Sequence, residues 1–478
     1  MKNRYYCIVI LLLLCQIVFA QNYSLFELLN LNDITTDAQI SISEEKINEY
    51  ENKLFRIQVF PKLYMTATLP NLTNNISSIA LSDGSEKFVN RSYMTSSVLF
   101  TANQLIPFTG GTISLSSGLT RLDNYSPLRT ISYNFNMFNL SYSQSISTFN
   151  AYRWEKKIRI KQNELFNISQ VQNRERINIR IIELFFNLLE SQKQEELNKL
   201  MEDTAKLIYE KAKNLYSIGR ISQIDLMDAE IGTKEFRTLT SSLEKIKHQN
   251  ALITELKLKD RKPTVYFDFD DIEKTIVSFN TEEVITRTLK YSAELQRELS
   301  LISEEKEIKK IKASILPSFS LSIGGGYNSQ NDVFKNLCDS PSRNLSIVAS
   351  IGIPILSWNE NKIQLKSTIE QSRISYMRHS KNVEELTSTT RFELESLRFI
   401  LNSIILSKEI LTTLYAQLQI ITEQFDSGRI SYAKIQDLKK EIMQTELKRI
   451  ENIKRFYIIR YKYRLLSLYD IIDNSVIY

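Results

Sequence analysis

Proline and glycine are scarce in this chain, with 8 and 11 occurrences in 478 residues, and they are unevenly placed. Residues 128–218 and 355–427 contain neither. Proline breaks a helix, and an interior glycine costs about 1 kcal/mol relative to alanine, so their absence permits very long helices. We predict long helices over residues 152–216 and 359–425, each about 95 Å long at 1.5 Å per residue. Shorter partner helices are predicted over residues 222–259 and 431–471.

Cysteine and histidine are also rare, which excludes several kinds of site. Cys7 and Cys15 lie in the N-terminal apolar segment. Only Cys338 would remain in a processed chain, so we expect neither a disulfide nor a cysteine metal cluster. His248 and His379 both fall within predicted helices, and no motif of nucleophilic, zinc-dependent or phosphate-binding enzymes occurs. We therefore expect no enzyme activity, no metal and no cofactor. The formal charge of +6 is too small to indicate nucleic-acid binding.

Residues 1–20 have the pattern of a secretory signal peptide. Lys2 and Arg4 precede an apolar run, and Ala20 offers a small residue at the expected cleavage point. Lipidation at Cys15 is an alternative, but the large residue before this cysteine disfavours it. No apolar run of eighteen or more residues follows. We therefore expect strands, and not a helix, to make any contact with a membrane.

Four segments alternate between apolar and small polar residues, which is typical of β-strands. They cover residues 63–69, 138–143, 318–327 and 345–355, and their polar positions are almost all Ser, Thr, Asn or Gly. Taken alone, this pattern fits a soluble sheet with one wet face. A secretory signal and strands of about ten residues favour instead a transmembrane β-barrel, with an apolar surface toward lipid and a polar lumen.

A duplicated tetrapeptide, Gly-Arg-Ile-Ser, marks two helical turns. It begins at Gly219 and again at Gly428, each time between two predicted helices whose apolar positions have coiled-coil spacing. Pro61 and Pro317 mark matching transitions from helix to strand. We therefore predict two tandem repeats and a linker between them, which cover residues 21–258, 281–478 and 259–280 respectively.

The first repeat has extra residues in its strand region. A turn signal at residues 106–111 is flanked by strand-like segments over residues 98–104 and 112–119. We predict an additional hairpin there, which gives about four strands in the first repeat and two in the second. The expected fold class is mainly α with a transmembrane β-barrel portion, in which each repeat contributes strands and a long helical hairpin.

Three motifs resemble those of the TolC family of outer-membrane efflux and secretion channels. Leu-Pro-x-Phe-x-Leu enters a strand at Leu316, and Pro-x-Leu leaves one at Pro354. The motif aromatic-x-x-Gly-x-x-Ser-x-x-Asp-Leu starts at Tyr216 and covers the first tip. The resemblance extends over nearly the whole mature chain, in two ordered copies. It implies a homotrimer in the outer membrane of a Gram-negative cell, whose shared β-barrel continues as an α-helical barrel through the periplasm. It also implies a passive exit duct that works with a periplasmic adaptor (membrane fusion) protein and an inner-membrane efflux pump or ABC transporter.

The resemblance also assigns roles to residues at the two tips. The family positions that contact the adaptor correspond here to Gly219, Arg220, Ile221, Gly428, Arg429 and Ile430. Family members often carry a small or apolar residue where Arg220 and Arg429 stand, so a different adaptor specificity is expected. Ser222 and Ser431 are expected to cap the helices that follow.

In the family, rings of aspartate narrow the periplasmic entrance. One such position is Asp437, but the other is Lys434, a departure that puts the usual cation-selective gate in doubt. The first repeat carries Asp225 and Asp228 in the corresponding helix. Our hypothesis is that Lys434 forms ion pairs with these carboxylates and holds the entrance shut. The alternative is that Asp225 is only a first-turn acid that the helix dipole stabilises.

The cargo stays open at this point. The expected function is an exit duct for small molecules such as drugs, detergents or metal ions. The alternatives are the exit duct of a type I protein secretion system and a non-conducting coiled-coil protein that bridges envelope layers. A bridging rod has no use for Ser-lined strands between its helices, whereas a lumen has. Six strands in each of three chains would give eighteen barrel strands, against the twelve that are usual in the family.

Overall fold

The computed structural model describes residues 22–80, 84–126, 128–146, 149–235, 239–269, 272, 279–353, 355–356, 358–427, 429–430 and 432–478. The predicted signal peptide lies outside these residues, as do Gly428 and Ser431 of the second tip. The chain divides into two compact units. The helical unit comprises residues up to Glu45, Glu164–Arg297 and His379–Tyr478, and the sheet unit comprises Lys46–Asn163 and Glu298–Arg378.

Two very long helices dominate the secondary structure. They are α4 (Ala151–Ser217) and α10 (Glu360–Asp426), and their bounds agree within one residue with those predicted from the lack of proline and glycine. The other α-helices are α2 (Leu25–Leu29), α3 (Thr36–Ile57), α5 (Gln223–Glu235), α6 (Leu239–Leu256), α8 (Thr281–Leu289), α9 (Leu295–Ile315) and α11 (Tyr432–Ser467). Short 3₁₀ turns occur at Asn32–Ile34 and Phe334–Asn336, and a π-helical turn at Lys290–Glu294 joins α8 to α9.

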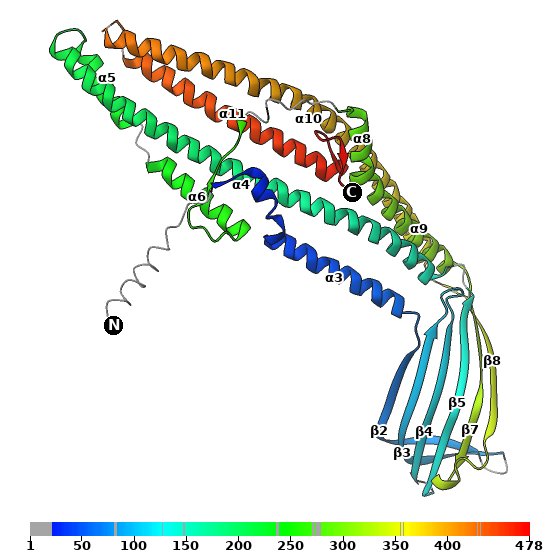
Figure 1. The fold of residues 1–478 in the computed structure, drawn as a ribbon. Coiled ribbons are helices and arrows are strands. Elements are labelled where there is room, and N and C mark those ends of the chain that lie inside the picture. The colour runs from blue at the N-terminus through cyan, green and yellow to red at the C-terminus, as the bar shows by residue number, and fades with distance from the viewer. Residues whose placement is uncertain are drawn as a thin grey trace, which may run out of the picture. The chain divides into compact units, whose positions relative to one another are not determined.

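The sheet unit contains one antiparallel sheet of six strands in the order β2-β3-β4-β5-β7-β8 (Figure 1). The strands are β2 (Lys62–Ala80), β3 (Glu86–Leu105), β4 (Thr112–Ser126), β5 (Thr130–Ile146), β7 (Ser318–Asn331) and β8 (Ser342–Gly352). Each of the four alternating segments overlaps one of these strands, although β8 ends at Gly352 and not at residue 355, and the additional hairpin is β3–β4. These six strand predictions are confirmed. The sheet is open within the chain, with β2 and β8 at its edges.

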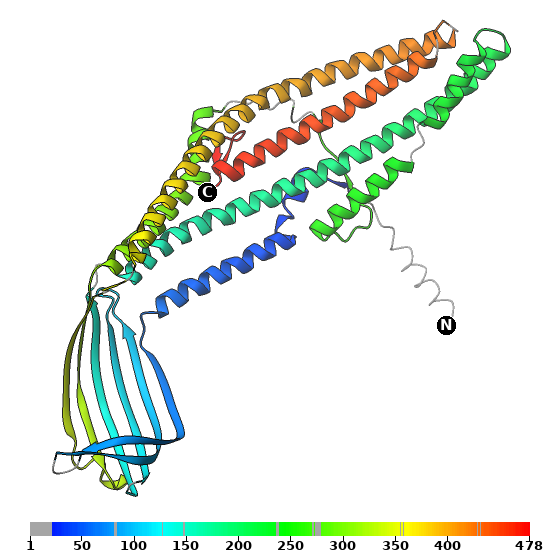
Figure 2. The same ribbon diagram turned by 180° about the vertical axis from the view of Figure 1, so that it is seen from behind.

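Strands β2 and β3 are longer than the predicted alternation. β2 continues past Pro70, and its register with β3 shifts between Thr68 and Asn71. Proline cannot donate a ladder hydrogen bond, so within a sheet it is tolerated at an edge strand or a bulge. Beyond this point the two strands turn across the end of the sheet, as Figures 1 and 2 show.

The core of the helical unit is built from apolar faces of α4, α10 and α11. Phe185 and Phe186 of α4 are fully buried in its largest cluster. The segment predicted as a linker takes part in this core, because the ring of Phe267 lies 5.4 Å from the ring of Phe186. In the same segment, β6 (Thr264–Val265) pairs in parallel with β1 (Asn22–Tyr23). Residues 264–267 of this segment are therefore packed in the helical unit.

The last helix ends earlier than predicted. We expected it to reach residue 471, but α11 ends at Ser467, and Leu468 has a φ of 52°, in the left-handed region that ends helices. A hairpin of β9 (Tyr469–Asp470) and β10 (Ser475–Val476) follows. Buried Asp470 accepts hydrogen bonds from Arg460 and Arg464, each at 2.9 Å. These contacts join the hairpin to α11.

The helix predicted over residues 222–259 is described as two helices, α5 and α6, with residues 236–238 between them outside the described part. α6 ends at Leu256, and the next residue, Lys257, has a φ of 50°. This prediction was wrong by about three residues at its end. Helical periodicity does not reveal such a stop, because neither proline nor glycine marks it.

Candidate functional site

Rows of side chains cross all six strands of the sheet, and successive rows lie on opposite faces. One row consists of Leu63, Ala102, Leu115, Leu140, Gly325 and Leu345. The next row along the strands consists of Tyr64, Thr101, Ser116, Asn139, Gly326 and Asn344. Because successive strand residues point to opposite faces, the first row belongs to an apolar face and the second to a mostly polar face.

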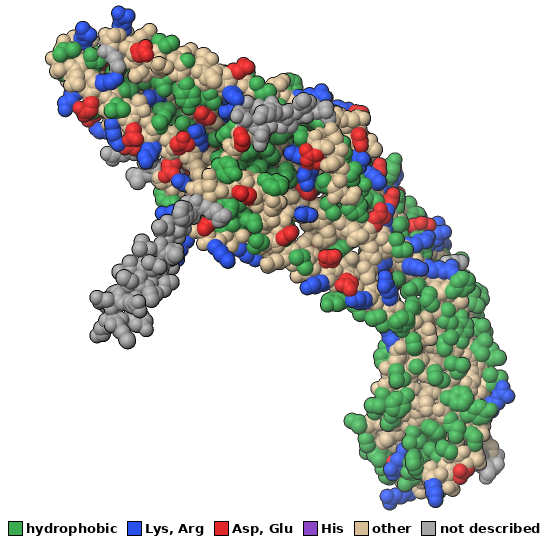
Figure 3. All heavy atoms as spheres, viewed as in Figure 1, with side chains coloured by type: hydrophobic (Ala, Val, Ile, Leu, Met, Phe, Trp, Pro, Cys, Tyr) green, Lys and Arg blue, Asp and Glu red, His purple; other side chains and the backbone are tan. Residues whose placement is uncertain are grey.

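The same separation continues on the other side of the apolar row. That row consists of Lys62, Asn103, Ser114, Ser141, Gly324 and Ser346, all polar or glycine. On the apolar face, Leu63 and Leu345 are 72% and 64% exposed. Figure 3 shows hydrophobic side chains gathered on the visible face of the sheet. Such a continuous exposed apolar surface indicates contact with lipid or protein.

Glycine in β7 allows a close approach of two strands. A side chain at Gly326 would overlap the carbonyl oxygen of Phe138 in β5, and the register between these strands shifts between Asn136 and Phe138. An irregular ladder brings a backbone close, and only glycine fits there. This finding supports close packing as the reason for glycine at residue 326.

Aromatic and basic side chains meet where the sheet joins the helices. Both tryptophans of the chain lie here: Trp154 in the first turn of α4, and Trp358 just before α10, where it is 82% exposed. The ammonium group of Lys157 lies 4.7 Å from the ring centroid of Trp154. The guanidinium group of Arg153 lies 4.9 Å from the ring of Phe108, in the turn between β3 and β4. Belts of this composition are typical of a membrane–water interface.

The first tip has the geometry of a glycine-terminated helix. Gly219 has a φ of 70°. Its amide donates to the carbonyl of Tyr216, and the amide of Arg220 donates to the carbonyl of Leu215, both at 2.9 Å. This pair of bonds is the Schellman motif, which favours glycine because of its left-handed backbone. Arg220 at the tip is exposed, whereas Ile221 is partly buried.

The start of α5 is capped by a reciprocal pair. The Oγ of Ser222 accepts a hydrogen bond from the amide of Asp225 at 3.1 Å. The amide and hydroxyl of Ser222 donate to the carboxylate of Asp225 at 3.1 and 2.7 Å. Such a capping box satisfies helix donors that would otherwise lack a partner. Asp225 is therefore engaged with the helix N-terminus in this chain.

The second tip shows the same helix-ending bond. The amide of Arg429 donates to the carbonyl of Gln424 at 3.0 Å, which matches the bond from Arg220 to Leu215. Arg429 is exposed and Ile430 is half-buried. The two tips lie together at one end of the helical unit (Figure 1) and share a buried cluster of six residues: Ile208, Ala212, Ala229, Phe425, Tyr432 and Ile435.

The four candidate gate residues are not paired with one another. Lys434 and Asp437 are exposed on α11, and Asp228 is half-buried on α5. Within the described part of the chain, no ion pair joins Lys434 to Asp225, Asp228 or Asp437. The ion pairs that the sequence suggested for Lys434 therefore stay a prediction.

The predictions from the sequence did not include two features of the tip region. Gly232 has no turn to make, but a side chain there would overlap the hydroxyl of fully buried Tyr432 on α11. Lys439 is only 1% exposed, and among the described residues its Nζ has no hydrogen-bond partner. Burial lowers the pKa of this amine to about 8. The lysine occupies a core-facing position of α11, which heptad spacing alone could have indicated.

Helix α10 is apolar on two faces. By length and composition it contains a stretch of 18 residues apolar enough to cross a membrane, 28% of it buried. Leu397, Ile404 and Leu411 face the core. On the other face, exposed apolar residues recur at heptad spacing: Phe392, Phe399, Leu406 and Ile420. A coiled-coil helix with a second apolar face accounts for this composition, and the second face has no cover within the described chain.

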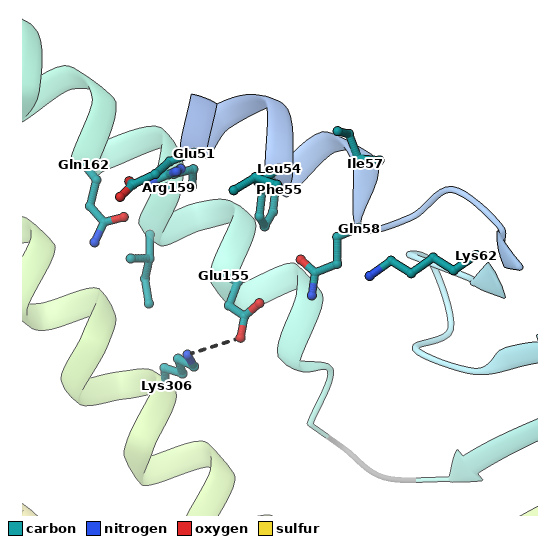
Figure 4. Close-up of a pocket in the computed structure, with 11 residues that line it drawn as sticks. Glu51, Leu54, Phe55, Ile57, Gln58, Lys62, Glu155, Arg159, Gln162 and Lys306 are labelled. Carbon is teal, nitrogen blue, oxygen red and sulfur yellow. Dashed lines mark hydrogen bonds and ion pairs between the residues drawn. The ribbon is translucent and has the colours of Figure 1, made fainter. Parts of the chain in front are cut away.

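A groove of about 730 Å³ in the sheet unit lies beside α3 and the start of α4 (Figure 4). Four of its charged side chains form two ion pairs. Arg159 binds Glu51 at 2.9 Å, and Lys306 lies 3.8 Å from Glu155. Among the described residues, no group of three or more His, Cys, Asp or Glu side chains is placed to hold a metal ion.

No protein-family model and no curated protein matches this sequence. Solved structures do match its fold over nearly the whole length. CusC, a protein described as undergoing folding and transmembrane channel formation, aligns with a TM-score of 0.65 at 13% identity, and the alignment covers 94% of this chain and 93% of CusC. The Campylobacter jejuni outer membrane channel CmeC aligns with a TM-score of 0.62 at 13% identity, and the alignment covers 92% of this chain and 85% of CmeC. The Neisseria gonorrhoeae outer membrane channel MtrE aligns with a TM-score of 0.55 at 14% identity, and the alignment covers 92% of this chain and 88% of MtrE. The resemblance that the motifs indicated is thus confirmed at the level of structure: this chain has the fold of the TolC-family outer-membrane channels.

Proposed function

We propose that the protein is an outer-membrane channel that serves as the passive exit duct of a tripartite efflux system. In this proposal three copies share one β-barrel in the outer membrane of a Gram-negative cell and continue it as a helical barrel in the periplasm. An inner-membrane pump supplies the energy, and a periplasmic adaptor connects the pump to the tips. The observation that carries the proposal is the two-faced sheet, within a fold shared with outer-membrane channels.

The sheet supports a lipid-facing wall around a wet lumen. Its apolar rows provide the surface that hydrocarbon requires, and its Ser-, Thr- and Asn-rich rows provide a surface that water wets. The aromatic and basic residues beside Trp154 and Trp358 fit the membrane interface on the helical side of the wall. Small neutral side chains bind solutes weakly, so such a lumen conducts without retaining its cargo.

The second apolar face of α10 supports assembly. Phe399 is 75% exposed in the single chain, and heptad spacing is the pattern that packs against another helix. In the assembly that we propose, the exposed apolar face of α10 packs against a neighbouring copy. A closed ring of identical copies uses one such heterologous contact throughout.

The tips support contact with an adaptor. Arg220 and Arg429 are exposed, each directly follows a glycine in the sequence, and the two tips that carry them share one buried cluster. Gly219, Ile221, Gly428 and Ile430 complete the proposed contact surface. Exposed Lys434 and Asp437, together with Asp228, are proposed to line the entrance, where their partners belong to neighbouring copies.

The exit duct of a type I protein secretion system remains the second candidate, because the pump and adaptor choose the cargo. A non-conducting bridging protein is disfavoured by the sheet. A rod needs only the helices, and the apolar face of the sheet would lie in water.

Two neighbouring residues of β5 test the proposal. Leu140 and Asn139 lie on opposite faces of the same strand. Lysine on a lipid-facing position costs about 2–4 kcal/mol near the bilayer midplane, so Leu140→Lys is expected to reduce the amount of assembled protein in outer membranes. Asn139→Lys should insert normally and shift the reversal potential in planar bilayers toward anion selectivity. Absence of conductance from the wild-type protein would contradict the channel, and so would equal tolerance of both substitutions.

A further inference from the structure

The edges of the sheet are incomplete in one chain. β2 and β8 each pair on one side only, so one row of backbone groups on each strand has no partner among the described strands. In a bilayer each unsatisfied backbone group costs several kcal/mol, and open edges do not occur there. Six strands are too few to close on themselves, since the smallest bacterial outer-membrane barrels have eight. Further strands must therefore come from other copies.

The strand directions show how copies join. All pairings from β2 to β8 are antiparallel, and an even number of strands makes β2 and β8 run in opposite directions. β8 of one copy can therefore extend the antiparallel ladder onto β2 of the next. The apolar row that begins at Leu63 ends at Leu345, so both edges present their apolar side chains on the same face. The joined sheet keeps one apolar and one polar face.

The additional hairpin lies in the middle of the sheet and is not an appendage. β3 pairs with β2 from Asn103 to Glu86, and β4 pairs with β5 from Thr112 to Asn124. Moving the hairpin out of the wall would break both of these ladders. Its side chains also follow the two-faced pattern, with Leu115 in an apolar row and Ser116 in a polar row. The hairpin is built as part of the wall.

We propose that three copies of this six-stranded sheet close an 18-stranded barrel, through pairing of β8 with β2 of the neighbouring copy. The number of copies rests on the proposed function. The number of strands per copy rests on the ladders described above. This barrel has half as many strands again as the twelve that the family resemblance implied.

A wider lumen follows from the strand count. With strands about 4.8 Å apart and tilted by about 40°, 18 strands enclose a backbone diameter of about 36 Å, against about 24 Å for 12 strands. The extra strands add Thr101, Asn103, Ser114 and Ser116 to the polar face. The barrel therefore accepts bulkier hydrated cargo than a 12-stranded barrel does. The helical part of the duct then determines which cargo can pass.

Two substitutions in β4 test whether the hairpin lies in the membrane. Leu115→Lys is expected to reduce outer-membrane assembly several-fold, as a buried charge facing lipid does. Ser116→Lys is expected to assemble normally and to shift the reversal potential toward anions. If the hairpin lay outside the wall, both variants would assemble and neither would change selectivity, and the inference would be wrong while the channel stood.

Strand counting by cryo-EM of the wild-type protein in lipid nanodiscs is the second test. We expect a three-fold ring of 18 strands. Deletion of residues 86–126 is expected to leave a three-fold ring of 12, because Leu63 and Leu140 occupy the same apolar row and can pair directly. A wild-type ring of 12 strands would overturn the inference and leave the proposed function intact. A protein without a ring or conductance would overturn the proposed function itself.

Discussion

Gly232 of α5 and Tyr432 of α11 are in direct contact, and a side chain at residue 232 would occupy the position of the tyrosine hydroxyl. Both residues are buried, and Tyr432 belongs to the cluster that joins the two tips. Residue 232 therefore sets how closely the two hairpins approach each other.

We expect Gly232→Ala to destabilise the tips by about 1–3 kcal/mol through overpacking. In an exposed helix the same substitution would stabilise by about 1 kcal/mol, so the sign of the change separates the two cases. Tyr432→Phe removes the hydroxyl and should restore part of the loss in the double variant. The measurement is the rate of limited proteolysis at the tips, with circular dichroism melting as a control for the whole protein. Faster cleavage of the double variant than of Gly232→Ala would argue against the contact.

Buried Lys439 makes stability depend on pH. Burial lowers the pKa of its amine to about 8 from an ordinary value of 10.5. Between these two pKa values the unfolded chain binds a proton that the folded chain has released. The free energy of unfolding therefore rises as the pH rises from about 8 to 10.5, and this increase is lost as the pH falls back toward 8. Lys439→Met should remove this rise and stabilise the protein at pH 7 by on the order of 1–3 kcal/mol.

The matched control for Lys439 is Lys448→Met, because Lys448 lies exposed on the same helix. It should leave both the thermal midpoint and its pH dependence unchanged. Melting curves of the detergent-solubilised protein at pH 7 to 10.5 provide the comparison. A wild-type midpoint that falls steadily over this range, with the same fall in Lys439→Met, would refute the role of the amine.

Asp470 links stability to acid. Its burial alone would raise the pKa of the carboxyl group, but hydrogen bonds and charge from Arg460 hold the pKa below its usual range. The ionised carboxylate of Asp470 therefore stabilises the folded protein at pH values above the ordinary pKa of an aspartate. This stabilisation is lost as the pH falls through the lower pKa that Asp470 has in the folded protein. Asp470→Asn removes the buried carboxylate that two partly buried guanidinium groups share, and losing these charged hydrogen bonds should cost about 1.5–3 kcal/mol.

The control for this prediction is Asp473→Asn, because the side chain of Asp473 is 62% exposed although it also binds Arg460. It should cost less than about 1 kcal/mol. Acid titration of the melting midpoint separates the two variants. Equal losses from both substitutions would show that burial of Asp470 has no special effect.

The sequence predicted elements well where the signal is local and poorly where it depends on a distant partner. The bounds of α4 and α10 were predicted within one residue, because the lack of proline and glycine is a property of each segment alone. The strands were recognised from alternation, but β2 and β3 continue through mixed residues whose pairing with each other decides the outcome. Gly232 had no explanation without Tyr432, two hundred residues away. Lys439 occupies a core-facing heptad position, but lysine is a residue type typical of the solvent-facing positions of a coiled coil.

The tip residues show the same limit. The helix-ending role of Gly219 follows from the break in a long helix, and the capping pair of Ser222 and Asp225 follows from their spacing. Whether Asp225 also acts on permeating ions depends on neighbouring copies, which local sequence does not encode. The proposed gate therefore stays a prediction.

Conductance separates the gate from the cap. Removal of a positive charge from the entrance by Lys434→Ala is expected to increase cation selectivity, seen as a shift of the reversal potential in a KCl gradient. Asp225→Ala should change both the helix cap and the entrance charge, whereas Ser222→Ala should weaken the cap by about 1 kcal/mol without changing charge. If Asp225→Ala and Ser222→Ala behave alike, and Lys434→Ala conducts like the wild type, these residues have no gating role.

The most direct test of the channel is imaging of the mature protein extracted from outer membranes in mild detergent. The account predicts a hollow particle with three-fold symmetry, in which a β-barrel with its polar face inside opens into a helical tunnel. A monomer, or a solid helical rod without a lumen, would contradict it.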